Sequence, residues 1–338
     1  MKAAYYTGNK SFTIESVQPA EPVQGEVQIS VSYCGICGSD LHVFHGAMDD
    51  RVGSHRVIGH EMSGKITAIG ENVQGLELGD PVVVRPLSAC GDCPACQRGH
   101  THICQNLKVL GVDIDGAFQQ IWTVPAHTIH KIPTDLRLDH AALIEPVAVA
   151  CHDVRRARLI AGEDTLIIGG GPIGLLIAMV AKHIGANVIL SEVNAYRLEL
   201  AQSLGFATLN PRKVNVADEI NEQTANKGAD VIFEVSGTQT GVDTMTEAAA
   251  TCCRIVMVAI HGTKPTVDLF KFVLREIELL GARVYKPDDF NHAIALVASG
   301  AIDCNSIITD VRPLDEITLA FEALSGNAPS MKSLIKCA

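Results

Sequence analysis

The stretch Thr165-Leu-Ile-Ile-Gly-Gly-Gly-Pro-Ile-Gly174 indicates how the second half of this chain folds. Its apolar start predicts a buried strand, and the proline predicts the first turn of a helix over residues 172–184, where a missing N–H costs little. Glycines between strand and helix permit a tight turn and close approach of a pyrophosphate to the helix N-terminus. The candidate cofactor-binding residues of this Gly-x-Gly-x-x-Gly loop are Gly169, Gly171, Pro172, Ile173 and Gly174.

Strand-like and helix-like segments alternate on either side of this loop. Residues 187–190, 231–235 and 254–259 are apolar runs of strand length, and residues 195–204 form an expected helix that Gly205 ends. Such alternation predicts an α/β domain, with a doubly wound parallel sheet covered by helices on both faces.

An acidic residue, Glu192, follows the second of these strands. A carboxylate at this place accepts hydrogen bonds from the adenosine ribose and repels a 2′-phosphate, which predicts NAD in preference to NADP. Arg197 lies near enough to weaken that preference, and both residues are candidate cofactor contacts. The alternatives are a glycine turn without a ligand and, for Glu192, a solvated helix cap.

Length, charge and cysteine content narrow the class of protein. A chain of 338 residues with 47% hydrophobic residues predicts a globular protein of two domains. The net charge of -11 disfavours binding to nucleic acid or to an anionic membrane. The N-terminus lacks a signal-peptide pattern and the apolar runs are too short to span a bilayer, so we expect a cytoplasmic protein.

In that compartment the 11 cysteines would be reduced, and clustered cysteines are then better explained by metal binding. Four of them, closely and unequally spaced, can converge on one tetrahedral ion. A closed set of four thiolates is typical of structural zinc. The predicted ligands are Cys90, Cys93, Cys96 and Cys104. Most of the others outside the metal motifs are expected to be small buried residues: Cys34, Cys151, Cys252, Cys253, Cys304 and Cys337.

A second metal site is expected from Cys37, His60, Glu61 and Glu145. One thiolate, one imidazole and one or two carboxylates leave a position open on zinc for water or a substrate oxygen. Zinc would lower the pKa of a bound alcohol, so that hydride can pass to a nicotinamide ring.

The released proton needs a route to solvent. Ser39 and His42 follow Cys37 by two and five residues and could form a hydroxyl-to-imidazole relay. Together with Glu61 and Glu145 they are the candidate catalytic residues. Cys34 and Cys37 also fit a Cys-x-x-Cys redox pair. Because such a pair should open a helix after a strand, and this segment looks glycine-rich and β-like, the metal site is favoured.

The first part of the chain predicts a different architecture from the second. Short alternating runs such as residues 27–31 and 81–85, with recurring glycines, indicate a β-rich domain up to about residue 140. The last fifty residues return to mixed patterning, with a helix expected over 291–299 and a strand over 331–336. We therefore expect the nucleotide domain to be inserted between two pieces of the β-rich one.

Taken together, these motifs resemble the zinc-dependent medium-chain dehydrogenase family, and within it the branch of polyol (sorbitol-like), threonine and butanediol dehydrogenases. The resemblance implies a GroES-like catalytic domain over residues 1–148 and 286–338, with a zinc lobe at about 88–106, and a Rossmann domain that binds NAD over 149–285. It implies that Cys37, His60 and Glu61 hold catalytic zinc, with Glu145 either a ligand or linked through water. It also places Ser236, Ala259 and Ile260 at the cofactor, and implies a homodimer or homotetramer.

The expected function is a zinc-dependent oxidoreductase that transfers hydride between NAD and a secondary alcohol. A polyol or a sugar-derived alcohol or acid is the first choice of substrate. L-threonine or a vicinal diol such as butanediol is the alternative. A metal-dependent interaction module, which the cysteine lobe alone would permit, is disfavoured by the intact nucleotide loop.

Overall fold

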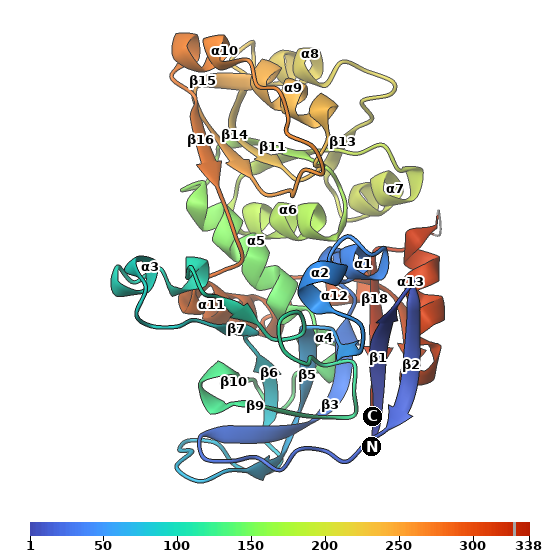
Figure 1. The fold of residues 1–338 in the computed structure, drawn as a ribbon. Helices are drawn as coiled ribbons and strands as arrows, with labels where there is room; N and C mark the ends of the chain where they lie inside the picture. The colour runs from blue at the N-terminus through green and yellow to red at the C-terminus, as the bar shows by residue number, and fades with distance from the viewer. Residues whose placement is uncertain (327–328) are drawn as a thin grey trace. The chain divides into compact units, whose positions relative to one another are not determined.

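A computed structural model describes residues 1–326 and 329–338, and it divides into two compact units. One unit comprises Met1–Glu145 with Lys286–Ala338, and the other comprises Pro146–Tyr285 (Figure 1). The second unit is therefore inserted in the sequence of the first. Within the described residues, no helix is both long enough and apolar enough to cross a lipid bilayer.

The first unit is built mainly from β-strands. Its largest sheet has the strand order β10-β6-β5-β3-β18-β17, with β9 also paired to β3, and smaller sheets are formed by β2-β1-β4 and β7-β8. The strands are β1 (Lys2–Gly8), β2 (Ser11–Ser16), β3 (Glu26–Gly35), β4 (Arg56–Val57), β5 (Glu61–Ile69), β6 (Pro81–Val84), β7 (Leu87–Ser88), β8 (Lys108–Val109), β9 (Ile121–Pro125), β10 (Ile129–Lys131), β17 (Ile308–Pro313) and β18 (Lys332–Lys336).

Helices, most of them short, connect these strands. They are α1 (Gly38–Phe44), α2 (Asp49–Val52), α3 (Pro94–Gln97), α4 (Leu138–Ala141), α11 (Pro287–Ala298), α12 (Cys304–Ile307) and α13 (Ile317–Ser325), with 3-10 turns η1 (Thr101–Ile103), η2 (Ala126–Thr128) and η3 (Leu314–Glu316). The predicted helix over 291–299 begins earlier, at Pro287, because the Asp289 carboxylate accepts a hydrogen bond from the main-chain N–H of Lys286 and caps the first turn.

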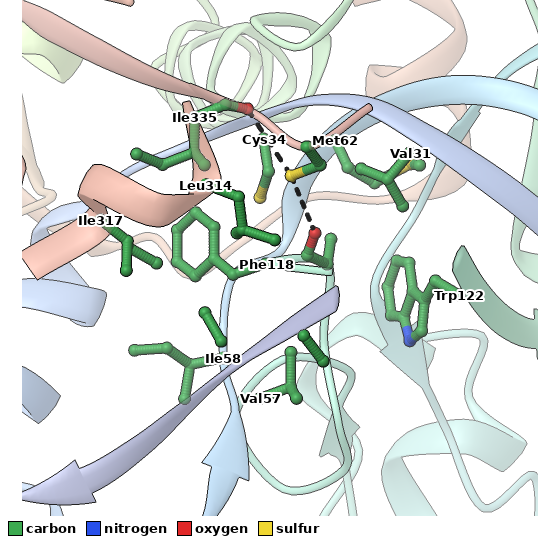
Figure 2. Close-up of a cluster of buried hydrophobic side chains, with 14 of the residues drawn as sticks. Val31, Cys34, Val57, Ile58, Met62, Phe118, Trp122, Leu314, Ile317 and Ile335 are labelled. Carbon is green, nitrogen blue, oxygen red and sulfur yellow. Dashed lines mark hydrogen bonds between the residues drawn. The ribbon is translucent and has the colours of Figure 1, made fainter. Parts of the chain in front are cut away.

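The core of the first unit joins residues that lie far apart in the sequence. Trp122 from β9, Met62 from β5 and Ile335 from β18 are buried in one cluster (Figure 2). Cys34 is also buried there, and the Cys337 thiol donates to the main-chain oxygen of Ala117 at 3.5 Å. These cysteines pack as small apolar residues, as expected. Of the six cysteines outside the metal motifs, Cys252 is the exposed one.

The second unit contains a six-stranded sheet of order β13-β12-β11-β14-β15-β16, all of whose pairs are parallel. The prediction of a doubly wound parallel sheet is confirmed, since the order reverses between β11 and β14, the two central strands. The elements are α5 (Ile144–Arg156), β11 (Asp164–Ile168), α6 (Pro172–Ile184), β12 (Asn187–Ser191), α7 (Ala195–Ser203), β13 (Ala207–Leu209), α8 (Val216–Gln223), β14 (Ala229–Glu234), α9 (Gln239–Glu247), β15 (Ala249–Met257), α10 (Leu269–Arg275) and β16 (Glu278–Gly281).

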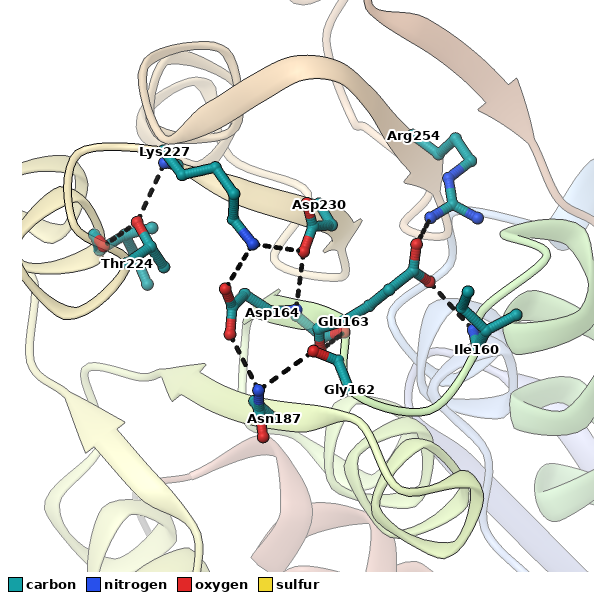
Figure 3. Close-up of polar contacts among 12 residues, drawn as sticks. Ile160, Gly162, Glu163, Asp164, Asn187, Thr224, Lys227, Asp230 and Arg254 are labelled. Atoms are coloured by element: carbon teal, nitrogen blue, oxygen red, sulfur yellow. Dashed lines mark hydrogen bonds and ion pairs between the residues drawn. The ribbon is translucent and has the colours of Figure 1, made fainter.

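Polar contacts fix the amino ends of the central strands of this sheet. The Lys227 ammonium lies 2.6 Å from Asp164 and 2.8 Å from Asp230, and the main-chain N–H of Asp164 donates to Asp230 at 3.0 Å (Figure 3). Beside them Arg254 forms an ion pair with Glu163. These contacts link β11, β14 and β15, and they lie at the opposite end of the strands from the glycine loop.

Candidate metal centres and dinucleotide loop

Three of the predicted metal ligands meet in the first unit. The ligand atoms of Cys37, His60 and Glu61 all lie within 4.8 Å of one another. Antiparallel pairing of β3 with β5 sets Gly35 opposite Glu61, and this brings the end of one strand beside the start of the other. An ideal Cβ on Gly35 would clash with a Glu61 carboxylate oxygen, so a larger residue here would displace the Glu61 side chain from its present position.

A buried carboxylate, Asp40, fixes two of these ligands. It accepts a hydrogen bond from the main-chain N–H of Cys37 at 2.9 Å, and its other oxygen lies 3.5 Å from His60 Nδ1. Burial alone would lower the pKa of His60, but the adjacent Asp40 raises the pKa well above its ordinary value. With Nδ1 directed to Asp40, Nε2 is the histidine atom that can ligate a metal.

Glu61 is held by Lys332, a buried lysine on β18. The Lys332 ammonium donates to one Glu61 carboxylate oxygen at 2.6 Å, contacts the other, and donates to the main-chain oxygen of Ile36 at 3.0 Å. Burial would lower the pKa of Lys332, but the Glu61 charge, with Cys37 and Glu145, raises it. The charge of Glu61 is therefore compensated inside the protein.

The donor set fits catalytic zinc, because a thiolate, an imidazole and a carboxylate leave one coordination position for a substrate oxygen. Glu145, the fourth residue expected here, lies outside the group of three. It is buried in the first turn of α5, and it acts on the pKa of Lys332 from there.

The candidate proton relay lies on α1. Ser39 is half-buried in its first turn and His42 is exposed in its last turn. Within the described part of the chain no direct hydrogen bond joins the two side chains, so a relay between them would need a substrate hydroxyl or water in line.

The reason given above against a Cys-x-x-Cys redox pair is wrong in one respect. Cys37 does open a helix after a strand, since β3 ends at Gly35 and Cys37 is the N-cap of α1. The pair is separated by packing instead: Cys34 is fully buried in the hydrophobic core, whereas Cys37 lies with His60 and Glu61. Burial raises the pKa of the Cys34 thiol well above its ordinary value, which opposes thiolate chemistry there.

The four clustered cysteines also converge. The sulfurs of Cys90, Cys93, Cys96 and Cys104 lie within 4.8 Å of one another, around the short helices α3 and η1. Main-chain N–H groups of Cys96 and Gln105 lower the pKa of Cys93 to about 6, and the N–H of Cys90 lowers the pKa of Cys104. Burial raises the pKa of Cys96 to about 12, so thiolate is favoured at two of the four sulfurs before a metal binds. Four converging sulfurs fit a closed tetrahedral zinc site.

The glycine loop of the second unit is shaped by close backbone contacts. An ideal Cβ on Gly174 would lie 1.9 Å from the main-chain oxygen of Gly169, and Gly169 itself has φ 105°. Gly171 is the N-cap of α6, which spans the predicted residues Pro172–Ile184, so unpaired N–H groups face the loop. This arrangement suits a bound pyrophosphate.

Glu192 is buried and braces this loop. One of its oxygens accepts the N–H of Gly170 at 2.8 Å, and the other accepts the N–H groups of Val193 and Asn194. The Arg197 guanidinium lies 3.8 Å away. The solvated helix cap considered above is therefore wrong, because Glu192 is only 6% exposed.

The remaining cofactor candidates follow β14 and β15. Strand β15 ends at Met257, two residues before the predicted end, so Ala259 and Ile260 lie in the following loop. An ideal Cβ on Gly237 would lie 3.3 Å from the main-chain oxygen of Ile260, which places this loop against the one that carries Ser236. By the general rule for open parallel sheets, ligands bind beyond these carboxyl ends.

Sequence reasoning missed Asp40 and Lys332. Asp40 stands within the quoted Cys37-Gly-Ser-Asp-Leu-His42 motif, where an acidic residue three positions after a candidate helix cap could have indicated it. Nothing in the sequence connects Lys332 with Glu61, since 271 residues separate them.

The fold and the donor sets define an oxidoreductase that uses zinc and a nicotinamide dinucleotide. Residues 23–134 match the alcohol dehydrogenase GroES-like domain, and residues 172–299 match the zinc-binding dehydrogenase domain. The chain belongs to the zinc-dependent medium-chain dehydrogenase family, whose members act on CH–OH groups.

The chain is 52% identical over 337 residues to 2-dehydro-3-deoxy-L-galactonate 5-dehydrogenase of Pseudoalteromonas atlantica, which covers 100% of this chain and 99% of that protein. Among solved structures, 2R,3R-butanediol dehydrogenase from Bacillus subtilis matches with TM-score 0.92 and 30% identity over 99% of both chains. A putative zinc-binding dehydrogenase from Sinorhizobium meliloti, bound to NADP, matches with TM-score 0.93 and 31% identity over 99% and 98% of the two chains.

Replacing Lys332 with methionine should destabilise the first unit, because Glu61 would keep a buried charge without its partner. We expect the free energy of unfolding to fall by about 3 kcal/mol. Fluorescence in urea would report on this unit, since its buried Trp122 is the single tryptophan of the chain. Lys336→Met, on the exposed end of the same strand, is the control and should change little.

The double variant Lys332→Met with Glu61→Gln should recover about half or more of that loss, because it removes both charges. If Lys332→Met alone unfolds like the parent protein, the ion pair does not stabilise the unit.

The two metal centres should respond differently to loss of a ligand. His60→Ala should abolish turnover and release about one zinc per chain. The protein should stay folded, because a metal site with an open coordination position contributes to catalysis and not to folding. Cys93→Ser should lower the thermal midpoint, because a closed site contributes to folding. Zinc content, circular dichroism and activity measured together test both. Retained turnover in His60→Ala would refute its assignment as a ligand.

Proposed function

We propose that this enzyme oxidises a secondary alcohol of a sugar-derived hydroxy acid, with NAD preferred to NADP. The observation that carries the substrate class is the identity of 52%, over the full length, to a dehydrogenase of a 3-deoxy sugar acid. The alternative is a vicinal diol, which the match in sequence and fold to a butanediol dehydrogenase favours.

When bound, zinc would provide a Lewis acid for the substrate hydroxyl, and NAD would provide the hydride acceptor. Cys37, His60 and Glu61 are proposed to hold the metal. Asp40 keeps His60 in one orientation, and Lys332 keeps Glu61 in place. Glu145 is proposed as an outer carboxylate near these groups.

The released proton is proposed to leave through Ser39 and His42. The Ser39 hydroxyl would accept the substrate proton as it gives its own proton to a water or hydroxyl in line with it. The His42 imidazole, one turn further along α1 and exposed, would receive that proton and pass it to solvent. An exposed imidazole suits this step because it can exchange protons directly with solvent.

The NAD preference is proposed to come from Glu192. Each carboxylate oxygen can accept more than one hydrogen bond, so the three N–H groups already bound to Glu192 leave capacity for ribose hydroxyls. Its charge opposes a 2′-phosphate, whereas Arg197 beside it reduces that opposition. The loop residues from Gly169 to Gly174 would hold the pyrophosphate.

A substrate panel tests this function. We expect kcat/KM for 2-dehydro-3-deoxy-L-galactonate with NAD to exceed the values for (R,R)-butanediol, L-threonine and sorbitol by about tenfold or more, since a site built for polar groups rejects analogues that lack them. Absorbance of the reduced cofactor gives the rates, and His60→Ala is the blank. A higher value for butanediol or threonine would overturn the substrate class, and a faster NADP reaction would overturn the cofactor preference.

We also propose a homodimer or homotetramer. The second unit has an edge strand, β16, and a neighbouring helix, α10, with apolar side chains that are largely exposed: Leu269, Phe270, Val273 and Leu274. An open edge beside apolar surface is a suitable face for a second copy of the chain. Val273→Lys should give a smaller particle in light scattering, whereas Leu78→Lys in the first unit should not. A parent protein of monomeric mass would contradict this proposal.

The compartment is proposed to be the reducing cytoplasm, because the two donor sets need thiolates. Disulfides found by thiol alkylation of the native protein would contradict it.

A further inference from the structure

A buried carboxylate outside the zinc site, Glu234, connects the two loops that follow β14 and β15. One of its oxygens accepts the N–H and the hydroxyl of Ser236, at 2.9 and 2.5 Å, and the N–H of Gly237 at 3.1 Å. Its main-chain oxygen accepts the N–H groups of Val258 and Ala259. Glu234 is fully buried at the end of β14. It is therefore a fixed anchor for both loops.

A single histidine side chain approaches this anchor from the loop after β15. His261 Nε2 lies 3.2 Å from the other oxygen of Glu234, and the side chain is 12% exposed. Within the described residues, His261 Nε2 makes no hydrogen bond of normal geometry. The charged group that it approaches is the Glu234 carboxylate. Because Ile260 precedes His261 and is 84% exposed, the histidine secures a loop that presents an apolar side chain outward.

The position of this pair in the sheet indicates which part of the cofactor it serves. A doubly wound sheet binds one mononucleotide on each half, with the pyrophosphate at the glycine loop between them. Glu192 follows β12 in one half, and His261 follows β15 in the other. The loop after β14 abuts the glycine loop, since an ideal Cβ on Gly169 would lie 3.0 Å from the Ser236 nitrogen. The second half therefore faces the nicotinamide nucleotide.

We propose that His261 is a positioning residue for the nicotinamide half of the cofactor, acting through Glu234 on the loop that carries Ala259 and Ile260. The proposal rests on the proposed cofactor role of these loops. Without the histidine, the loop keeps its main-chain bonds at Val258 and Ala259 but loses its side-chain anchor one residue beyond Ile260. Loosening there costs binding energy for a ligand that touches Ile260 and leaves the adenosine side unaffected.

Two ligands isolate the contribution of the nicotinamide ring: NADH, and ADP-ribose, which keeps both riboses and the pyrophosphate but lacks the ring. By titration calorimetry of the zinc-loaded protein, His261→Ala should raise the Kd of NADH by about fivefold or more, the scale of one polar contact to a charged group. The Kd of ADP-ribose should change by less than about twofold. In turnover, KM for NAD should rise while KM for the alcohol stays the same.

Three further variants guard against a general loss of structure. His261→Gln can place an amide N–H where Nε2 lies, so NADH binding should recover, whereas His261→Asn is too short and should remain weak. His183→Ala, an exposed histidine in the last turn of α6, should leave both ligands unchanged.

Equal weakening of NADH and ADP-ribose by His261→Ala, unchanged NADH binding, or no difference between the Gln and Asn variants would each overturn the positioning role. A parent protein that binds neither ligand would instead refute the proposed function, and with it this inference. Binding of NADH by the parent, with selective loss in His261→Ala, supports both.

Discussion

The antiparallel pairing of β3 with β5 is the constraint on which the zinc-type site depends. It brings Cys37, just past the end of one strand, beside His60 and Glu61 at the start of the other. The same pairing favours glycine at position 35, where any side chain would displace the Glu61 carboxylate. The metal donors are therefore set by register, because a shift of one residue would turn Glu61 to the other face of the sheet.

Charge compensation is the second requirement of this site. Asp40 and Glu61 are both buried carboxylates, and each lies beside a basic side chain. His60 lies beside Asp40, and Lys332 forms an ion pair with Glu61. A buried carboxylate without such a partner would be costly. In the second unit, Glu192 and Glu234 instead accept hydrogen bonds largely from main-chain N–H groups of the loops around them.

Local signals in the sequence predicted the local parts of this structure well. The helix after the glycine loop, the parallel sheet and the four-cysteine set depend on spacing within short segments, and spacing is visible in the sequence. The other donor set joins two short motifs through the pairing of β3 with β5. The family follows from these motifs and is confirmed by the domain matches. The roles of individual site residues remain proposals.

What could not be predicted depends on contacts between distant segments. Lys332 reaches Glu61 only because β18 pairs with β3. The environment of Cys34 follows from packing against residues such as Cys337, and this packing, not the absence of a helix, separates it from Cys37. His261 was not singled out because its partner lies on another strand.

The placement of Lys332 also bears on how the protein is made. The strand that carries it pairs beside β3, although synthesis of the two is separated by the entire second unit. While the chain is still on the ribosome, the cysteine, histidine and glutamate donors are all present, yet the ammonium that neutralises the glutamate is not. The second unit can fold during this interval, since domains generally fold as units in order of synthesis. The candidate zinc site is therefore expected to form late, after residue 332 has emerged from the ribosome and β18 can pair with β3.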